Sequence, residues 1–236
     1  MCYTIIQQHE DFQMRKKLQV GVLASGGGTD LQSIIDACEN NRINAQVAVV
    51  VSDNCDAYCM KRAEKHSINC SFISAEGLNR KEHDSKVDKV LCEHKVDLVV
   101  GAGYMRIMSP GFVKKWYGSM INIHPALLPS FKGANGQGEA VDYGVKITGC
   151  TTHFIDEEMD HGPIILQAAV KVLSDDTRDT LASRILEVEH QILPRTIDLF
   201  EQKRLEIIGR KVMIAPGDSW KDKYPVIDNV LYSIGY

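Results

Sequence analysis

Short apolar runs alternate with amphipathic stretches along the first half of the chain. Four mainly apolar runs have the length of a β-strand: residues 18–24, 46–52, 70–73 and 97–103. Three intervening stretches place apolar side chains at helical spacing: residues 31–40, 57–66 and 81–95. The runs are continuously apolar, which is typical of parallel strands covered on both faces. The first half is therefore predicted to form a Rossmann-like layer of βαβ units with right-handed crossovers.

The pattern changes in the second half, where fewer helical stretches separate the strands. Strands are predicted at residues 120–124, 147–155 and 163–172, and a hairpin at residues 205–214. A long helix is expected to begin near Thr177, with an apolar stripe of Leu181, Ile185, Val188 and Ile192. Pro194 is expected to bend or interrupt this helix, because proline lacks the amide hydrogen. The predicted fold class is α/β, with a mostly parallel central sheet, helices on both faces and a mixed C-terminal half.

No linker and no change of composition divides the chain into separate globular parts. We expect an N-terminal extension of residues 1–17, whose polar sequence has no clear period. Residues 18–214 are expected to form one domain, followed by a polar and aromatic tail at residues 215–236. The roles of the extension and of the tail are open.

The composition argues against several classes of protein. Of the 236 residues 44% are apolar, enough for a sizeable core, and the net charge of -4 argues against nucleic-acid or anionic-membrane surfaces. No apolar run approaches the ~20 residues that span a bilayer, and the first residues lack the apolar core of a signal peptide. Seven cysteines without a C-x-x-C pair predict reduced thiols rather than disulfides or a zinc site. We therefore expect a cytoplasmic protein that needs no metal.

A glycine-rich turn, residues 25–30, lies between the first predicted strand and the first predicted helix. Glycines allow backbone amides to approach a ligand, and a helix N-terminus favours an anion. Leu31 replaces the third glycine of a dinucleotide fingerprint, and no P-loop lysine follows, so a single phosphate is favoured. The alternative is a plain turn with Thr29 or Asp30 as the helix N-cap. An ionised Asp30 would repel a phosphate unless it caps the helix or is neutralised.

Three residues suggest chemistry at a carbonyl group. Asn122 and His124 lie two residues apart on a predicted strand, so they share a face, at the end where open α/β sheets bind ligands. Asp160 follows in a predicted loop, from which a carboxylate can meet the histidine. Amide and imidazolium hydrogens stabilise the oxyanion that forms when an amine attacks a carbonyl, and a carboxylate favours the charged histidine. The alternative is that His124 is an ordinary loop histidine.

Five stretches closely resemble the glycinamide ribonucleotide transformylases, a family of folate-dependent formyltransferases. They are VLASGGGTDLQSIIDA (22–37), GAGYMRIMSP (101–110), INIHPALLPSFKG (121–133), GVKITGCTTHF (144–154) and DEEMDHGPIILQ (156–167). The resemblance covers roughly residues 18–200 in order. It implies a Rossmann-like formyltransferase fold and transfer of the formyl group of 10-formyltetrahydrofolate, the co-substrate, to the amine of glycinamide ribonucleotide in de novo purine biosynthesis.

The resemblance also implies a role for individual residues. The catalytic residues would be Asn122, His124 and Asp160, with His153 in a supporting place. The ribonucleotide would be bound by Gly28, Thr29, Asp30 and Glu189, and the folate by Arg80, Met105, Arg106, Ile107, Met108 and Asp156. The family commonly has Asn at the position of Asp30, and it has a cis peptide before the residue matching Pro129. Residues 18–117 would then form the phosphate-binding half of the domain, and residues 118–214 the catalytic and folate-binding half.

From the residues alone, other interpretations of these positions stay open. Glu189 fits a solvated helix face, Arg80 a surface charge, and the methionines Met105 and Met108 the core. Methionyl-tRNA formyltransferases and formyltetrahydrofolate hydrolases share the trio, but each needs an additional domain for which this chain is short. A hydrolase and a catalytically silent folate or nucleotide binder remain alternatives. We expect small-molecule substrates as partners, with no nucleic acid and no membrane, and leave open whether the chain forms a homodimer.

Overall fold

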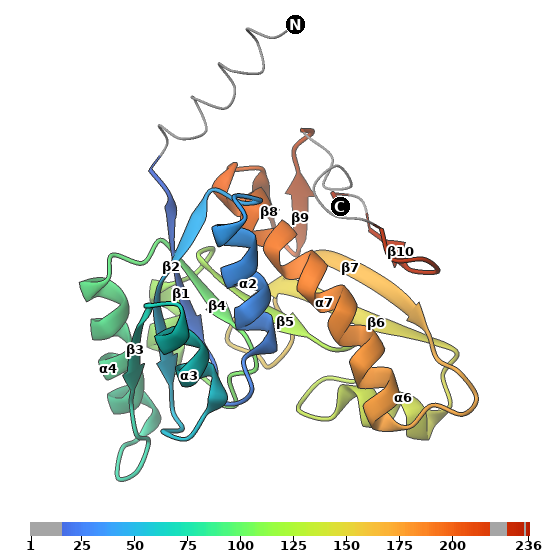
Figure 1. The fold of residues 1–236 in the computed structure, drawn as a ribbon, viewed down its shortest axis with the longest axis horizontal. Coiled ribbons are helices and arrows are strands. Elements are labelled where there is room, and N and C mark those ends of the chain that lie inside the picture. The colour runs from blue at the N-terminus through green and yellow to red at the C-terminus, as the bar shows by residue number, and fades with distance from the viewer. Residues whose placement is uncertain (1–15, 218–225, 234) are drawn as a thin grey trace, which may run out of the picture.

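One ten-stranded sheet runs through the protein, whose computed structural model describes residues 16–217, 226–233 and 235–236 (Figure 1). The strand order is β3-β2-β1-β4-β5-β6-β7-β9-β8, and β10 pairs with β7. Nearly all of the predicted extension, residues 1–17, and part of the predicted tail lie outside the described residues.

The first half of the sheet is parallel throughout. Its strands are β1 (Leu18–Leu23), β2 (Ala45–Ser52), β3 (Asn69–Phe72), β4 (Leu98–Gly101) and β5 (Met120–His124). The helices between them are α2 (Thr29–Glu39), α3 (Tyr58–Lys65), α4 (Arg80–Glu93) and α5 (Pro110–Lys115). Because these strands run the same way, the loops that follow them meet at one edge of the sheet.

The second half is mixed, as predicted. Strands β6 (Ile147–Phe154) and β7 (Ile164–Lys171) continue the sheet in antiparallel pairing from β5. The hairpin of β8 (Leu205–Ile208) and β9 (Lys211–Ile214) forms the edge, and β10 (Leu231–Tyr232) pairs with β7 in antiparallel fashion. The remaining helices are α6 (Gly136–Tyr143) and α7 (Arg178–Glu201).

Apolar side chains cover the sheet on both faces. One cluster joins α2, α3 and α7 to the strands, with Ile34, Ile35 and Ile192 at its centre. The other joins α4 and α5 to the opposite face and includes Val87 and Phe112. Strands buried on both sides must be apolar at successive positions, which explains the continuous runs in the sequence. The predicted α/β fold class is confirmed.

Helix α7 is not interrupted at Pro194, one of the two outcomes expected there. The helix runs without interruption from Arg178 to Glu201, with Pro194 inside it. A proline inside a helix costs about 3 kcal/mol, because it removes one helical hydrogen bond and its ring crowds the preceding turn. The surrounding residues 191–199 are all buried, and Thr196 returns a hydrogen bond of 2.8 Å to the carbonyl of Ile192. Packing around the proline therefore outweighs its local cost. The short helices α5 and α6 were not predicted, because α5 has only six residues and α6 begins with a glycine.

Two further observations bear on the sequence-based expectations. Within the described ranges, no helix is long and apolar enough to cross a membrane. The six cysteines there form no disulfide, and Cys2 lies outside the described residues.

We predict that Gly149→Ala destabilises the fold. Gly149 lies in β6, where a β-carbon would overlap the carbonyl oxygen of Ala168 on β7. A backbone oxygen cannot rotate away, so the free energy of unfolding should fall by about 3 kcal/mol. Urea denaturation measures the change.

The matched control is Gly111→Ala in α5, where a β-carbon meets no atom within 4 Å. That variant should stay within about 1 kcal/mol of the unaltered chain. Equal stability of the two variants would contradict the close pairing of β6 and β7 at this position.

Candidate active site

Asp160 lies between two histidines from neighbouring strands. Its Oδ2 atom is 3.4 Å from Nδ1 of His124, and its Oδ1 atom is 3.8 Å from Nε2 of His153. The same carboxylate accepts a hydrogen bond of 2.8 Å from the amide of Gly133. Asn122 completes the group, since its Nδ2 atom lies 3.3 Å from Nε2 of His153. The three residues predicted to be catalytic therefore lie together, with His153 among them.

The imidazole of His124 is buried, and both of its nitrogens face oxygen atoms. Nε2 lies 2.7 Å from the carbonyl oxygen of Phe131, while Nδ1 faces Asp160. Only the protonated ring carries hydrogens on both nitrogens, so these surroundings suit an imidazolium. The carboxylate adds Coulomb attraction for that charge.

His153 is set up to be neutral and to orient Asn122. Burial lowers the pKa of His153, and its Nδ1 atom lies 2.9 Å from the carbonyl of Phe154. A hydrogen on Nδ1 leaves Nε2 as an acceptor for the amide of Asn122. Because that amide carries two hydrogens, the second one is available to an oxygen of a substrate.

Hydrogen bonds fix the segment that follows His124. The Leu128–Pro129 peptide bond is cis, which confirms the expectation from the resemblance. Thr151 on β6 donates from Oγ1 to the carbonyl of Ala126 at 2.7 Å and accepts from the amide of Leu128 at 3.1 Å. The chain between the histidine and the proline is therefore tied to the neighbouring strand.

The glycine-rich turn is built against α3. Gly28 has a φ of 68°, and a β-carbon there would lie 2.6 Å from Cβ of Cys59, so only glycine fits. The carbonyl of Gly27 accepts a hydrogen bond of 2.8 Å from Nε of Arg62. At Gly26 and Gly27 an added β-carbon would meet no atom within 4 Å. Helix α3 therefore fixes the carbonyl of Gly27, while the space beside Gly26 and Gly27 stays open.

Asp30 does not cap α2. Gly28 takes the N-cap position, and no side chain bonds to it, so the capping interpretation of Thr29 or Asp30 was wrong. Oδ1 of Asp30 lies 3.9 Å from Nε2 of His190 and, among the described residues, has no hydrogen-bond partner. Burial raises the pKa of Asp30 from 3.8 to about 7. Near neutral pH a large fraction of the molecules therefore carries an uncharged Asp30, because no counter-ion in the described part of the chain stabilises its charge.

Glu189 is the second unusual carboxyl of the site. It lies on α7 and is only 5% exposed, so the alternative of a solvated helix face was wrong. Burial, and then the charge of Asp30, raise the pKa of Glu189 well above its usual value. A pair of buried carboxyls without a cation retains a proton into the neutral range.

A pocket of about 310 Å³ opens beside the glycine-rich turn, between α2, α3 and α7. It is lined by Thr29, Gln32, Ser33, Asp36, Arg42, Arg62 and His190, so two guanidinium groups stand against one carboxylate. Hydroxyl groups, a guanidinium and an imidazole beside a helix N-terminus together favour an anionic, hydroxyl-bearing ligand.

The segment of residues 105–108 is anchored at both ends. The amide of Met105 donates to Oγ of Ser25 at 2.9 Å, and that hydroxyl donates to Oδ1 of Asp53 at 2.6 Å. The amide of Ser109 donates to Oδ2 of Asp84, which lies on α4. One serine therefore links the glycine-rich turn to this segment, which was predicted to bind folate.

The side chains of this segment are largely outside the core. Met105 is 67% exposed and Ile107 52%, while Arg106 and Met108 are half-buried. The core interpretation was therefore wrong for Met105. Met108 packs against the apolar cluster that joins α4 and α5 to the sheet, so the core interpretation is partly confirmed there. The apolar surface of Met105 and Ile107 lies open, where it is available to a flat ring.

Arg80 and Asp156 lie at the border of the site. Arg80 is the exposed first residue of α4, and within the described residues no hydrogen bond or ion pair joins it to residues 105–108. Asp156 is engaged within its own loop, with Oδ2 2.7 Å from Nδ1 of His161. Its Oδ1 atom accepts from the amide of Glu158 at 3.1 Å. Asp156 also acts electrostatically on His153, so its loop lies near the trio.

Five residues that help to build the site were not identified from the sequence: Ser25, Asp53, Asp84, Phe131 and His190. Ser25 and His190 adjoin predicted site residues, and this was the only signal that could have marked them. The others act from distant elements or through a backbone carbonyl. Among the residues that the structure describes, no three His, Cys, Asp or Glu side chains are grouped so as to hold a metal ion.

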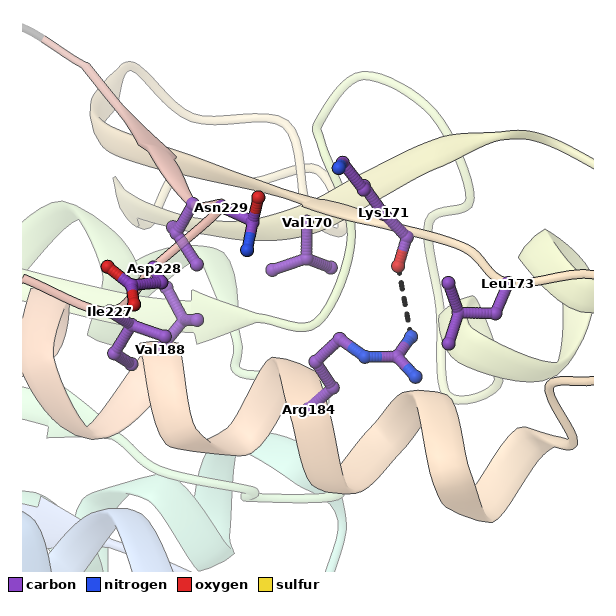
Figure 2. A pocket seen from close by; sticks show the side chains of 9 residues that line it. Val170, Lys171, Leu173, Arg184, Val188, Ile227, Asp228 and Asn229 are labelled. Atoms are coloured by element: carbon purple, nitrogen blue, oxygen red, sulfur yellow. Dashed lines mark hydrogen bonds between the residues drawn. The ribbon is translucent and has the colours of Figure 1, made fainter.

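A second pocket, of about 340 Å³, lies between α7, β7 and residues 227–230 (Figure 2). Arg184 spans it and donates to the carbonyl of Lys171 at 3.0 Å. None of its lining residues belongs to the predicted site.

Comparison with known proteins agrees with this geometry. The sequence model of the family described as "Formyl transferase" matches residues 18–197. Phosphoribosylglycinamide formyltransferase of Haemophilus influenzae is 40% identical over 190 residues, which are 80% of this chain and 90% of that protein. The crystal structure of glycinamide ribonucleotide transformylase 1 from Symbiobacterium toebii superposes with a TM-score of 0.83 at 44% identity, covering 85% of this chain and 95% of that one.

A longer relative is matched only in part. Human trifunctional purine biosynthetic protein adenosine-3 is 44% identical over 195 residues, which are 82% of this chain. The chain spans 19% of the length of that protein. The similarity therefore concerns one part of the trifunctional protein.

We predict that Asp30→Asn stabilises the protein at alkaline pH. The folded state keeps a proton on Asp30 up to about pH 7, whereas the unfolded chain loses it near pH 3.8. Stability of the unaltered chain should therefore fall as pH rises from about 4 to 7 and level off above that. At pH 8 the variant should be more stable by roughly 2–4 kcal/mol.

Urea denaturation from pH 4 to pH 8 measures this difference, with Asp175→Asn, which removes an exposed carboxylate, as the matched control. A pH dependence that is the same in both variants would show that Asp30 ionises normally in the folded protein.

Proposed function

The chain belongs to the formyl transferase family, and we propose that it transfers the formyl group of 10-formyltetrahydrofolate to the amine of glycinamide ribonucleotide. The products are formylglycinamide ribonucleotide and tetrahydrofolate, a step of de novo purine biosynthesis. The single observation that carries the proposal is the contact of Asp160 with His124 beside the amide of Asn122.

The amine of the ribonucleotide attacks the formyl carbon and creates a tetrahedral oxyanion. The second amide hydrogen of Asn122 and a hydrogen of the His124 imidazolium stabilise this negative charge. Asp160 stabilises the imidazolium and helps to carry the proton that the amine loses to the N10 atom of the folate. Collapse of the oxyanion then breaks the bond between the formyl carbon and N10, which releases tetrahydrofolate. No serine or cysteine nucleophile is needed, because the amine is itself the nucleophile.

The carbonyl of Phe131 holds the imidazole before the substrate arrives. It accepts from Nε2 of His124 at 2.7 Å, the atom best placed to donate to an oxyanion. The formyl oxygen takes the place of this carbonyl when the substrates bind. The ring is therefore kept in its working orientation in the absence of a ligand.

The ribonucleotide occupies the edge formed by the glycine-rich turn and α7. Its phosphate lies at the turn of Gly28, Thr29 and Asp30, against the N-terminus of α2. A protonated Asp30 donates a hydrogen bond to a phosphate oxygen, where an ionised one would repel it. Glu189 accepts hydrogen bonds from ribose hydroxyls.

The folate lies along the segment of Met105, Arg106, Ile107 and Met108. Backbone groups there bind the pterin while the apolar side chains cover its ring. Arg80 and the loop of Asp156 border the same region. The predicted division of the domain stays a proposal: the phosphate site falls in residues 18–117 and the catalytic trio in residues 118–214. The proposed folate residues 105–108 and Arg80 belong to the first part, and Glu189 belongs to the second. We keep cytoplasmic location, the absence of a metal, and small molecules as partners, without nucleic acid or membrane, as parts of this proposal; a homodimer is left open.

The proposal predicts release of tetrahydrofolate that depends on the ribonucleotide. Supplying 10-formyltetrahydrofolate with and without glycinamide ribonucleotide, and following absorbance, measures this release. Release without the ribonucleotide would point instead to a formyltetrahydrofolate hydrolase. No release under either condition would contradict formyl transfer and favour a silent binder.

We further predict that His124→Ala lowers kcat by about 10²–10⁴-fold while the affinity for substrates changes little. Asp160→Asn should lower kcat similarly, because it removes the charge that supports the imidazolium. Steady-state kinetics measure both effects.

His94→Ala, a substitution at the C-terminal end of α4, is the matched control and should keep full activity. Turnover by His124→Ala equal to that of this control would rule out the mechanism.

A further inference from the structure

The end of the chain returns to the sheet beside the proposed active site. Leu231 and Tyr232 pair with Ala169 and Ala168 of β7. The pairing continues at Ser233, whose amide donates to the carbonyl of Gln167 at 2.8 Å. These residues lie beyond the part of the chain that the family's sequence model matches, residues 18–197.

Two tyrosines of this segment bind one side chain of α7. The hydroxyls of Tyr232 and Tyr236 donate to Oε1 of Gln191 at 2.7 and 2.6 Å. Their rings are stacked, with centroids 3.9 Å apart. Arg195, one turn further along α7, donates from Nε to the carbonyl of Gly235 at 2.8 Å. The chain end is therefore hydrogen-bonded to α7 at two successive turns.

Gln191 follows directly after the residues of α7 that face the substrate side. Glu189 and Gln191 lie two positions apart, so they project from nearly opposite sides of the helix. Glu189 and His190 face Asp30 of α2, whereas Gln191 faces the chain end. The rotation of this turn about the helix axis is therefore set from both sides.

Apolar side chains of the chain end also pack on this part of the molecule, since Ile227, Val230 and Tyr232 contact the cluster that contains Val188, Ile192 and Tyr236. The 340 Å³ pocket separates residues 227–230 from Val188 and Arg184, which lie on the preceding turns of α7 (Figure 2). The hydrogen bonds at Gln191 and Arg195 therefore add directional contacts to this apolar packing, and a change from tyrosine to phenylalanine removes the donors while it keeps the rings.

A second path leads from the chain end to the catalytic histidine. The amide of Gln167 donates to Oγ of Ser233 at 3.0 Å. Its side-chain Nε2 atom donates to the carbonyl of Leu128 at 3.0 Å and lies 3.1 Å from Oγ1 of Thr151. Thr151 stands opposite His124 in the pairing of β5 with β6. Gln167 therefore joins the chain end to the segment that follows the histidine.

We propose that the described end of the chain, residues 226–233 and 235–236, is a positioning element of the active site. Tyr232 and Tyr236 fix the turn of α7 that bears Glu189 and His190, and Ser233 acts through Gln167 on the segment after His124. This inference rests on the proposed function, because it assigns Glu189 to the ribonucleotide and His124 to the formyl group.

The test separates the two paths by their kinetic effects. The double variant Tyr232→Phe/Tyr236→Phe keeps both rings and removes both donors to Gln191. The KM for glycinamide ribonucleotide should rise about tenfold, while kcat and the KM for folate stay within about twofold. The matched control is Tyr117→Phe, which alters a tyrosine that is 55% exposed on another part of the surface.

Gln167→Leu removes the donor to Leu128 and keeps the apolar bulk. Here kcat should fall about tenfold and its pH profile should shift, because the surroundings of His124 change, while the ribonucleotide KM stays the same. Gln46→Leu, at an exposed position of β2, is the matched control. A thermal unfolding scan confirms that each variant is folded.

Two results would overturn the proposal. One is kinetics of both variants equal to those of their controls. The other is a fall in kcat of the same size in both variants, with unchanged KM values. That pattern would mean that less of each variant is folded, and not that separate groups of the active site are misplaced.

Hydrogen exchange of α7 gives a readout that does not depend on activity. In the tyrosine double variant, amides around Gln191 should exchange faster while those of α4 do not change. If the unaltered chain releases no tetrahydrofolate, the proposed function fails. Unchanged exchange around Gln191 then rejects the positioning role separately, and faster exchange retains the chain end as the element that orders this turn.

Discussion

The carboxylate of Asp160 is the contact on which the proposed chemistry depends. It comes from a loop remote in sequence, yet it lies 3.4 Å from His124 and 3.8 Å from His153 while accepting the amide of Gly133. A buried carboxylate is tolerated only where donors or positive charge compensate its lost hydration. His124 and the amide of Gly133 supply this compensation, so the carboxylate joins the strand that carries His124 to the segment around Gly133, while the neutral His153 lies beside it. The proposed mechanism uses the same charge to support the imidazolium.

The carboxyls proposed to bind the ribonucleotide lose hydration without gaining the compensation that Asp160 has. Glu189 is buried and Asp30 is largely shielded from solvent, and this loss of hydration raises the pKa of both. A neutral carboxyl both donates and accepts hydrogen bonds, so the pair suits a ligand that carries phosphate and hydroxyl groups. The chain thus holds one carboxylate whose charge is compensated and two carboxyls whose charge is suppressed, within one edge of a sheet. Their different surroundings, rather than their residue type, separate these roles.

The loops at this edge are held by side chains that would never touch a substrate. Ser25 binds the amide of Met105 and the carboxylate of Asp53, and so joins the two regions assigned to the two substrates. Gln167 and Gln191 do the same from the other side, by tying the chain end to β7 and α7. Loops that emerge from parallel strands need such anchors, because the sheet fixes where each loop begins and leaves its path free. Precision of about an ångström in a reacting group then depends on residues outside the site.

The sequence by itself determined the order and type of most elements, because continuous apolar runs and helical stripes are local patterns. It also marked Asn122 and His124 as one face of a strand and Asp160 as a loop carboxylate that can meet the histidine, and the resemblance assigned the three their roles. Only the tertiary structure decided which groups meet: that Asp30 is buried against His190 rather than capping its helix, and that the carbonyl of Phe131 holds the histidine. It also determined that α7 continues past Pro194, because the residues around the proline are packed on all sides. The reason is physical: hydrophobic periodicity is written in neighbouring residues, whereas burial, charge suppression and hydrogen bonding to a backbone carbonyl depend on elements far apart in the chain.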